Sequence, residues 1–406
     1  MKIGLYGIGG VYNFGCEAIV RGATKLIRKF YKDSTIIYFS YNYEYDKKAL
    51  ADLNIEIYSI QRERRIVPRA INKVCNYLNT DHHPLLFDFK TMLSMVDEVW
   101  SVGGDIYTIP AVLREQKKYP YYNSVIDFCD RAVEAGKKVV LYGASVGPFG
   151  DYDKAVVYYV KSLQRYDKIL CRETVTLEYL RGLGLANAIF FPDPAFQVRG
   201  QVAVDNGNRD GKDSAAEKKI GVNLSPLSLN ELYGDHKEDN IIKFAKIMDQ
   251  VIENFDMKLL FIPHVISQDE NDDDLRFQKK IINYMEHKDQ TQIADYSKGF
   301  LGLKPQIRQC RFVISARMHC GINAIVENIP VIFLSYSSKS IGMCEYIYRD
   351  RRWLLDLKEV ENELIDKLNE MNTEAVDIST DLLIRNNEIQ EECDRLLSVL
   401  ARENYE

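Results

Sequence analysis

The sequence predicts an α/β protein of two domains, each built on a parallel β-sheet. Three observations support this fold class. The length of 406 residues fits two domains of roughly 150 residues or more. Short apolar runs alternate with longer amphipathic runs, as strands and helices do in parallel-sheet proteins. The alternation stops in the polar stretch 200–219 and starts again after it.

The first domain is predicted to span residues 1–199. Its strands are short apolar runs, expected at residues 3–6, 35–40, 98–101, 138–142, 168–171 and 188–191. Helices with apolar residues at helical spacing are expected between them, at 16–30, 122–135, 152–164 and 175–180.

The second domain is predicted to follow a linker. Residues 200–219 read GQVAVDNGNRDGKDSAAEKK, which is nearly free of large apolar groups and cannot add to a core. Residues 220–379 then carry expected strands at 220–224, 258–262, 312–315 and 331–334, with helices at 239–254, 274–287, 305–309, 320–327 and 341–347. Residues 380–406 are predicted to form one amphipathic helix that packs back on the domains.

The composition excludes several classes of protein. There are 53 basic and 59 acidic residues, so the net charge is −6, which disfavours a nucleic-acid-binding protein. Apolar residues make up 46% and charged residues 28%, which excludes wholesale disorder. The chain starts MKIGLYGIGG, which is no signal peptide, and no apolar stretch approaches a membrane span. A cytoplasmic protein is therefore expected.

The eight cysteines carry no metal or disulfide pattern. They contain no CxxC pair, so reduced thiols are expected and zinc binding is not. The acidic run DENDDD at 269–274 lacks the glycine and glutamate of an EF-hand and is expected to be a solvated loop. Tyr41, Tyr43 and Tyr45 are expected on one face of a strand end. The basic run RERR at 62–65 is short, and contact with an anionic lipid head group is its functional alternative.

The segment 311–334, RFVISARMHCGINAIVENIPVIFL, is the most informative. A strand is expected to end at Ser315 or Ala316, and a helix to begin near Cys320. Arg317 and His319 would then stand at a helix N-terminus, which attracts anions. Arginine adds a planar fork for carboxylate or phosphate, and histidine can move a proton near neutral pH. The alternative is a pair of solvated side chains on an exposed turn.

Further candidates follow other strands. Arg172 comes after the strand at 168–171 and precedes Thr174, the expected helix N-cap; a pair with Glu173 or a structural bridge is the alternative for Arg172. His264 follows the strand at 258–262 and is either a ligand contact or a structural histidine. Polar residues near other strand ends either contact a ligand in the cleft or only cap a loop or face solvent. They are Asn223, Ser225, Tyr336 and Lys339, of which Lys339 is a candidate phosphate contact.

Two glycine-rich turns follow strands of the first domain. The first, GIGGVYNFG, has Tyr12 where the dinucleotide fingerprint requires Gly or Ala, so a nicotinamide or flavin site is not expected. Either turn could instead approach a sugar or phosphate closely, with tight-turn geometry as the alternative. The residues that would contact a ligand in the cleft are Asn13, Gly15, Gly104 and Asp105.

Together these segments resemble the polysaccharide pyruvyl transferase family. The likeness runs from the first glycine turn through SVGGD, LYGASVGP, CRETVTLEYLRGLG, FPDPAF, GVNLSP and FIPH to SARMHCGINA. It implies two facing Rossmann-like domains in a glycosyltransferase-B-like arrangement, with the acceptor side and part of the donor site on the first domain. The first turn departs from the family's G-N-x-G-D form, because Cys16 stands before Glu17.

The resemblance implies an enzyme that transfers pyruvate from phosphoenolpyruvate to a sugar of a polysaccharide or lipid-linked oligosaccharide. The products would be a pyruvate ketal and phosphate. His319 would transfer a proton, and Arg172, Arg317, His264 and Lys339 would bind the donor. No metal or cofactor is required, and no nucleic acid is involved. A transient contact with the inner face of the membrane stays open.

Two other functions stay open. The stretch from His319 to Pro330 also looks like the HxGxxSxxEAxxxGxP segment of nucleotide-sugar glycosyltransferases and epimerases, in which Glu327 would hold a ribose. The second is a non-catalytic glycan-binding protein of a polysaccharide assembly system. The paired Arg and His count against it, because sugar recognition alone does not need them.

Overall fold

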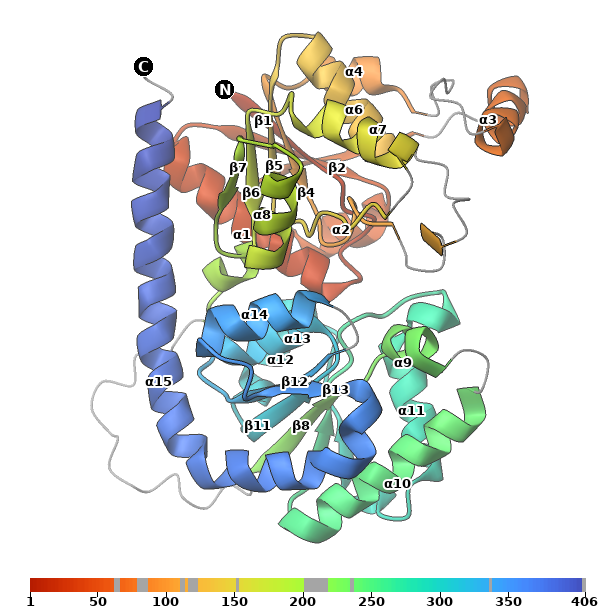
Figure 1. Cartoon of the computed structure of the whole chain (residues 1–406), viewed down its shortest axis with the longest axis vertical. Helices are drawn as coiled ribbons and strands as arrows, with labels where there is room; N and C mark the ends of the chain where they lie inside the picture. Colours follow the sequence, from red (N-terminus) through yellow and green to blue (C-terminus); the bar gives the residue numbers. More distant parts are fainter. Residues whose placement is uncertain are drawn as a thin grey trace. The chain divides into compact units, whose positions relative to one another are not determined.

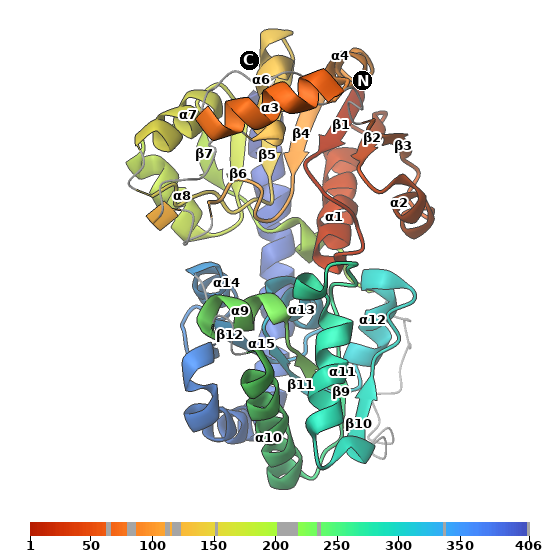
Figure 2. The same ribbon diagram turned by 90° about the vertical axis from the view of Figure 1, so that its right-hand side faces the viewer.

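The computed structural model describes residues 1–61, 66–78, 87–109, 114–115, 123–150, 153–200, 218–233, 237–335 and 338–403 (Figures 1 and 2). It divides into two compact units. The first unit comprises Met1–Val11, Ile19–Pro194 and Cys393–Glu406, and the second comprises Tyr12–Ala18 and Ala195–Glu392. The segment expected as a linker, 200–219, lies almost entirely outside the described residues.

The first unit is built on a seven-stranded sheet in the order β3-β2-β1-β4-β5-β6-β7. All neighbouring strands are parallel. The order reverses direction between β1 and β4, which is the arrangement of a doubly wound sheet. The strands are β1 (Lys2–Tyr6), β2 (Thr35–Ser40), β3 (Glu56–Ser59), β4 (Glu98–Val102), β5 (Lys138–Tyr142), β6 (Lys168–Cys171) and β7 (Ala188–Phe190).

Helices cover this sheet because both of its faces are apolar. Ile3 and Leu5 of β1 point to one face and Tyr6 to the other, and all three are fully buried. Fully buried strands of this kind belong to parallel sheets covered on both sides. The helices of this part of the chain are α1 (Phe14–Phe30), α2 (Tyr43–Ala49), α3 (Ile66–Leu78), α4 (Phe89–Ser94), α6 (Ser124–Glu134), α7 (Asp153–Leu163) and α8 (Thr174–Gly182). The division assigns the first turn of α1 to the second unit.

The second unit repeats this plan with six parallel strands in the order β10-β9-β8-β11-β12-β13. Its order reverses between β8 and β11. The strands are β8 (Lys219–Asn223), β9 (Leu259–Phe261), β10 (Thr291–Ile293), β11 (Cys310–Ser315), β12 (Val331–Ser335) and β13 (Leu354–Asp356). The predicted α/β class with two parallel sheets is thus confirmed.

The helices of the second unit connect these strands. They are α9 (Pro226–Tyr233), α10 (Lys237–Phe255), α11 (Asp274–Tyr284), α12 (Gly299–Ile307), α13 (Met318–Ile325), α14 (Ser338–Tyr348) and α15 (Val360–Glu403), the last of which ends in the first unit. Short 3₁₀ turns lie at η1 (Pro194–Gln197), η2 (Glu270–Asp272), η3 (Lys288–Gln290) and η4 (Leu357–Glu359).

The C-terminal helix corrects a predicted boundary. It was expected from residue 380, but α15 begins at Val360. Buried apolar residues recur on it every three or four positions, and this stripe starts well before residue 380: Val360, Leu364, Leu368, Met371, Ala375 and Ile378. Interspersed Asn and Thr weakened the helical signal there. Among the described residues, no helix is both long and apolar enough to cross a membrane.

Local corrections concern weak signals. Tyr43 and Tyr45 lie in α2 rather than on a strand face, because Asn42 and Tyr43 turn the chain into a helix directly after β2. The helix expected at 305–309 is α12, which begins at Gly299 and carries Pro305 in its interior. The strands β3, β10 and β13 were not predicted, and they have only three or four residues each.

Candidate functional site

Polar residues gather at the carboxyl ends of β8, β9 and β11 in the second unit. Asn223 is the last residue of β8, His264 follows β9, and Arg317 follows β11. The strand order reverses between β8 and β11, and ligands of open α/β sheets bind outside the strand ends at such a point. These three residues therefore lie where a ligand is expected to bind.

A buried ion pair holds the turn that carries Arg317. Its Nε and Nη2 donate to Asp274 Oδ1 at 3.1 and 2.8 Å, and Nη2 also donates to Asp272 Oδ1 at 2.7 Å. Burial would lower the pKa of Arg317, but the two carboxylates outweigh burial and raise this pKa above its ordinary value. The backbone N–H of Arg317 donates to Asn223 Oδ1 at 2.8 Å. These bonds fix the direction in which the β11–α13 turn leaves the sheet.

Asp274 is the centre of this network. It is completely buried, and its Oδ2 accepts hydrogen bonds from the amides of His264 and Val265 and from Asn223 Nδ2. Burial raises the pKa of Asp274, and the Arg317 guanidinium acts against that rise. The expectation of a solvated acidic loop at 269–274 is thus wrong for its last two residues, since Asp273 is buried as well. The only sequence signal was the need of a buried arginine for a carboxylate.

His264 is a neutral imidazole enclosed by rings. The residue is 1% exposed, and its ring packs edge-on against Phe14 and Phe300. Burial lowers the pKa of His264 well below its ordinary value, and the nearby charges of His319, Arg317 and Lys304 lower it further. Its Nε2 is buried and makes no hydrogen bond to the described part of the chain. A ligand atom could satisfy this nitrogen.

His319 packs against the first glycine turn. It is the second residue of α13, and its side chain is partly exposed. A Cβ on Gly15 would lie 2.8 Å from His319 Nδ1 and 2.9 Å from its Cβ and Cγ. Any larger residue at position 15 must therefore displace the imidazole. Asn13 shapes the same turn, because its Oδ1 accepts from the amide of Gly15 at 3.0 Å.

Glu327, which follows the C-terminus of α13, is held by two cations. Its Oε1 lies 3.0 Å from Lys304 Nζ and accepts from the Gly200 amide, and its Oε2 accepts from Arg308 Nε at 2.6 Å. Burial lowers the pKa of Lys304 to about 8, although Glu327 opposes this. Burial would raise the pKa of Glu327, but Lys304, Gly200 and Arg308 lower it overall. Lys304 was not among the predicted site residues.

A second cluster lies in the first unit, around Arg172. This side chain is 2% exposed, and its Nε and Nη2 donate to Ser145 Oγ at 3.1 and 2.9 Å. Its Nη1 donates to Asp193 Oδ2 at 3.2 Å, and Asp105 Oδ1 lies 3.6 Å from Nη2. The cluster joins the ends of several strands of the sheet. Arg172 thus makes a structural bridge, one of its two alternatives.

The helix cap next to Arg172 differs from the prediction. Glu173, not Thr174, is the N-cap of α8, and its Oε2 accepts from the Thr176 amide at 2.8 Å. The Glu173 carboxylate therefore caps the helix rather than pairing with Arg172. Gly104 lies beside the cluster, since its carbonyl accepts from the Ser145 amide.

The remaining predicted residues have local or undescribed positions. Ser225 is buried, and its hydroxyl has no hydrogen-bond partner among the described residues. Tyr336 lies outside the described residues. Lys339 belongs to the first turn of α14, but its side chain is outside the description. Glu17 accepts from the Phe300 amide at 2.8 Å and so caps α12.

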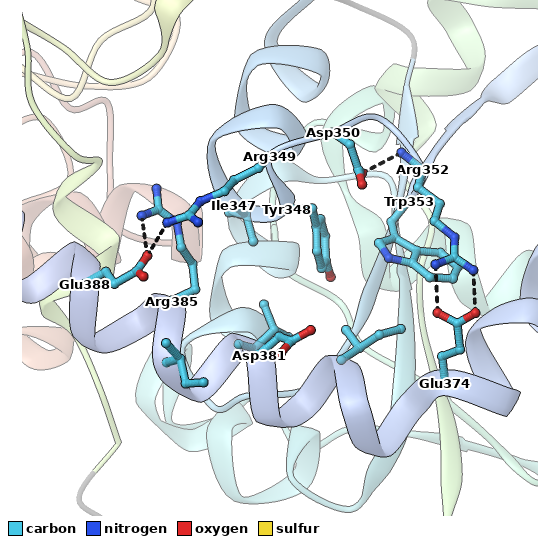
Figure 3. A pocket seen from close by; sticks show the side chains of 13 residues that line it. Ile347, Tyr348, Arg349, Asp350, Arg352, Trp353, Glu374, Asp381, Arg385 and Glu388 are labelled. Carbon is cyan, nitrogen blue, oxygen red and sulfur yellow. Dashed lines mark hydrogen bonds and ion pairs between the residues drawn. The ribbon is translucent and has the colours of Figure 1, made fainter.

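Other features of the described residues do not form a competing centre. A pocket of about 320 Å³ lies between α15 and the segment joining α14 to β13, which is the amino-end edge of the sheet (Figure 3). Its arginines are paired with acids of α15: Arg352 with Glu374, and Arg385 with Glu388. Within the described ranges, no group of three His, Cys, Asp or Glu could hold a metal ion.

The family profile of polysaccharide pyruvyl transferases matches residues 13–338. The chain belongs to this family. The segments by which the sequence resembles the family fall into the two clusters. SVGGD, LYGASVGP, CRET and FPDPAF supply Asp105, Ser145, Arg172 and Asp193 in the first unit, and GVNLSP, FIPH and SARMH supply Asn223, His264, Arg317 and His319 in the second.

The chain is also similar to individual proteins. The amylovoran biosynthesis protein AmsJ of Erwinia amylovora is 24% identical over 269 residues, which is 64% of this chain and 62% of that protein. HepE of Anabaena, solved with UDP and glucose, has a TM-score of 0.60 at 10% identity and covers 99% of this chain and 100% of its own. The UDP-GlcNAc 2-epimerase of Methanocaldococcus jannaschii has a TM-score of 0.54 at 14% identity, covering 93% and 92%. The two structures share the fold of this chain.

Proposed function

We propose that the protein transfers pyruvate from phosphoenolpyruvate to a sugar of a polysaccharide or lipid-linked oligosaccharide. The product is a cyclic ketal that bridges two hydroxyls, and phosphate is released. The observation that carries the proposal is that the segments typical of the family bring polar side chains together at strand ends in each unit, with His319 and His264 in the second unit. A link to polysaccharide synthesis also stands in the name of the similar protein AmsJ.

The reaction needs a group that moves protons at a buried, anion-binding place. The donor's methylene carbon gains a proton, one sugar hydroxyl adds to the adjacent carbon, phosphate leaves, and a second hydroxyl takes its place. Of the two hydroxyl protons, one balances the proton on the new methyl group and the other leaves with phosphate. His319 stands at the N-terminus of α13, where the helix dipole favours the anionic donor. It is our candidate for proton transfer.

His264 and the ion pair have different roles in this proposal. The neutral His264 offers a buried Nε2 to the phosphate or to an acceptor hydroxyl. The Nε and Nη2 of Arg317 are engaged by Asp274 and Asp272, so we assign it mainly to positioning His319, with its positive field favouring the donor. Arg172 and Lys339 remain proposed donor contacts. No metal or cofactor has a role in these steps.

The rival function is nucleotide-sugar chemistry, which the fold also supports in other proteins. There the glutamate of the helix after the HxG segment would hold a ribose. In this chain both oxygens of Glu327 are engaged by Lys304, Arg308 and the Gly200 amide. A ribose would have to displace at least one buried ionic contact, which favours the pyruvyl transferase.

Two measurements test the proposal. Phosphoenolpyruvate is expected to raise the melting temperature of the protein, whereas UDP-glucose and UDP-GlcNAc are not. With glycan acceptors that carry free hydroxyl pairs, phosphate release from phosphoenolpyruvate is expected to fall about 10²–10⁴-fold in His319→Ala. His287→Ala is the matched control, because His287 is a histidine of the same unit that pairs with Glu253. Stabilisation by a UDP-sugar alone would refute the proposal.

A further inference from the structure

Helix α3 (Ile66–Leu78) exposes large apolar side chains over its whole length. Six of its residues are between 48% and 88% exposed: Ile66, Val67, Ile71, Val74, Tyr77 and Leu78. Figures 1 and 2 draw the helix outside the layers that cover the seven-stranded sheet. A soluble surface rarely presents so many apolar residues together unless they contact a partner or a membrane.

The apolar residues of α3 share one face. At 3.6 residues per turn they fall within an arc of about 140°, with Arg69 and Asn72 on the opposite side and Lys73 at the edge of the apolar arc. A face this wide exceeds the narrow seam by which two helices of a coiled coil meet. It is typical of a helix that lies in the surface of a bilayer.

The charge around α3 is opposite in sign to that of the whole chain. From Arg64 to Thr80 the sequence is RRIVPRAINKVCNYLNT, with four basic residues and no acidic one, whereas the chain carries −6 overall. Basic residues beside an apolar helical face attract anionic lipid head groups. Two copies of α3 placed face to face would instead bring like charges together.

We propose that α3 is a membrane-docking helix that binds the surface of an anionic lipid bilayer. Its 13 residues span about 20 Å, too short to cross a bilayer, so the helix lies in the plane of the surface. Ile71 and Val74 insert among the acyl chains, while Arg69 and Lys73 remain at the head groups. The inference rests on the helix alone and does not depend on the reaction proposed above.

Vesicle flotation with the full chain tests this docking. The protein is expected to float with vesicles of phosphatidylcholine and phosphatidylglycerol at 70:30, and much less with phosphatidylcholine alone. Ile71→Asp/Val74→Asp is expected to lose binding at least about tenfold. Arg69→Glu/Lys73→Glu is expected to weaken it about 25-fold or more at low salt, from about fivefold for each charge.

The matched control places the same substitution on another exposed apolar surface. Val376→Asp on α15 replaces a side chain that is 68% exposed and is expected to float like the wild type. Far-UV circular dichroism and the melting temperature establish that each variant is folded. Phosphoenolpyruvate binding, measured without vesicles, is expected to be unchanged in all of them, so failure of the proposed reaction would be seen separately.

Three results would overturn the inference. The wild type could stay in the soluble fraction with both vesicles, or Val376→Asp could lose flotation as fully as the α3 variant. Sedimentation could also reveal a concentration-dependent dimer that Ile71→Asp/Val74→Asp abolishes, with no vesicle binding, and α3 would then contact a second copy of the chain.

Discussion

Replacing Asp274 by Asn tests whether the buried ion pair builds the site. Asp274 accepts two hydrogen bonds from Arg317 and three from Asn223 and the amides of His264 and Val265. The amide group of Asn keeps the shape but turns one acceptor into a donor that faces other donors. Among the described residues, the carboxylate that then still pairs with Arg317 is that of Asp272, which is partly exposed.

Asp274→Asn is expected to lower the free energy of unfolding strongly, because the charge of its partner Arg317 stays largely buried. Removing one member of a buried ion pair costs about 3–5 kcal/mol of the free energy of unfolding. Asp272→Asn should cost less than about 1 kcal/mol, since its side chain is 28% exposed and solvent screens the pair. Asp381→Asn on α15 is the control for loss of a surface carboxylate.

Urea unfolding can report on the second unit by itself. The chain has two tryptophans, Trp100 in the first unit and Trp353 in the second, and both are 3% exposed. In a Trp100→Phe background, the fluorescence of Trp353 follows the unit that carries Asp274. Equal small losses for Asp274→Asn and Asp272→Asn, each below about 1 kcal/mol, would contradict the reasoning.

Three further predictions address the rest of the site. Gly15→Ala is expected to displace His319 and so to lower phosphate release from phosphoenolpyruvate at least about tenfold. Gly9→Ala is the control, because open space surrounds Gly9, and it should leave phosphate release unchanged. Equal activity of the two variants would refute this prediction. His264 stays neutral when folded, so below about pH 6.5 only the unfolded state gains its proton. The free energy of unfolding should therefore fall as the pH is lowered, by up to about 1.4 kcal/mol per unit, and His264→Gln, but not His287→Gln, should reduce this slope in urea titrations at several pH values. Glu327→Gln is expected to cost about 3–5 kcal/mol of unfolding free energy but to leave the melting-temperature rise with phosphoenolpyruvate in place; loss of that rise would show that Glu327 contacts a ligand.

The strands and the RMH turn could be predicted because their signals are local. Apolar runs such as 35–40 and 138–142 coincide with β2 and β5, and Arg317 and His319 stand at the turn expected for them. The strands β3 (EIYS) and β10 (TQI) were not predicted because polar residues interrupt them, and β13 (LLD) has only two apolar residues in a row.

The partners of the site residues could not be predicted because they come from distant parts of the chain. Asp274 stands in an acidic run that looks solvated, and only the fold places it against Arg317. Gly15 and His319 are about 300 positions apart, and their contact depends on the first turn of α1 joining the second unit. Lys304 precedes a proline inside α12 and gave no sign that it is buried against Glu327.

The assignment of Tyr12–Ala18 to the second unit limits how the protein can be dissected. A fragment that starts at residue 195 would contain every strand of the six-stranded sheet yet lack Phe14, Gly15 and Glu17. His264 would lose a ring neighbour, and the Phe300 amide would lose its carboxylate acceptor. A free-standing version of this unit therefore has to carry residues 12–18, for example in a circular permutant or as an added peptide, and such a peptide could be titrated to restore the site.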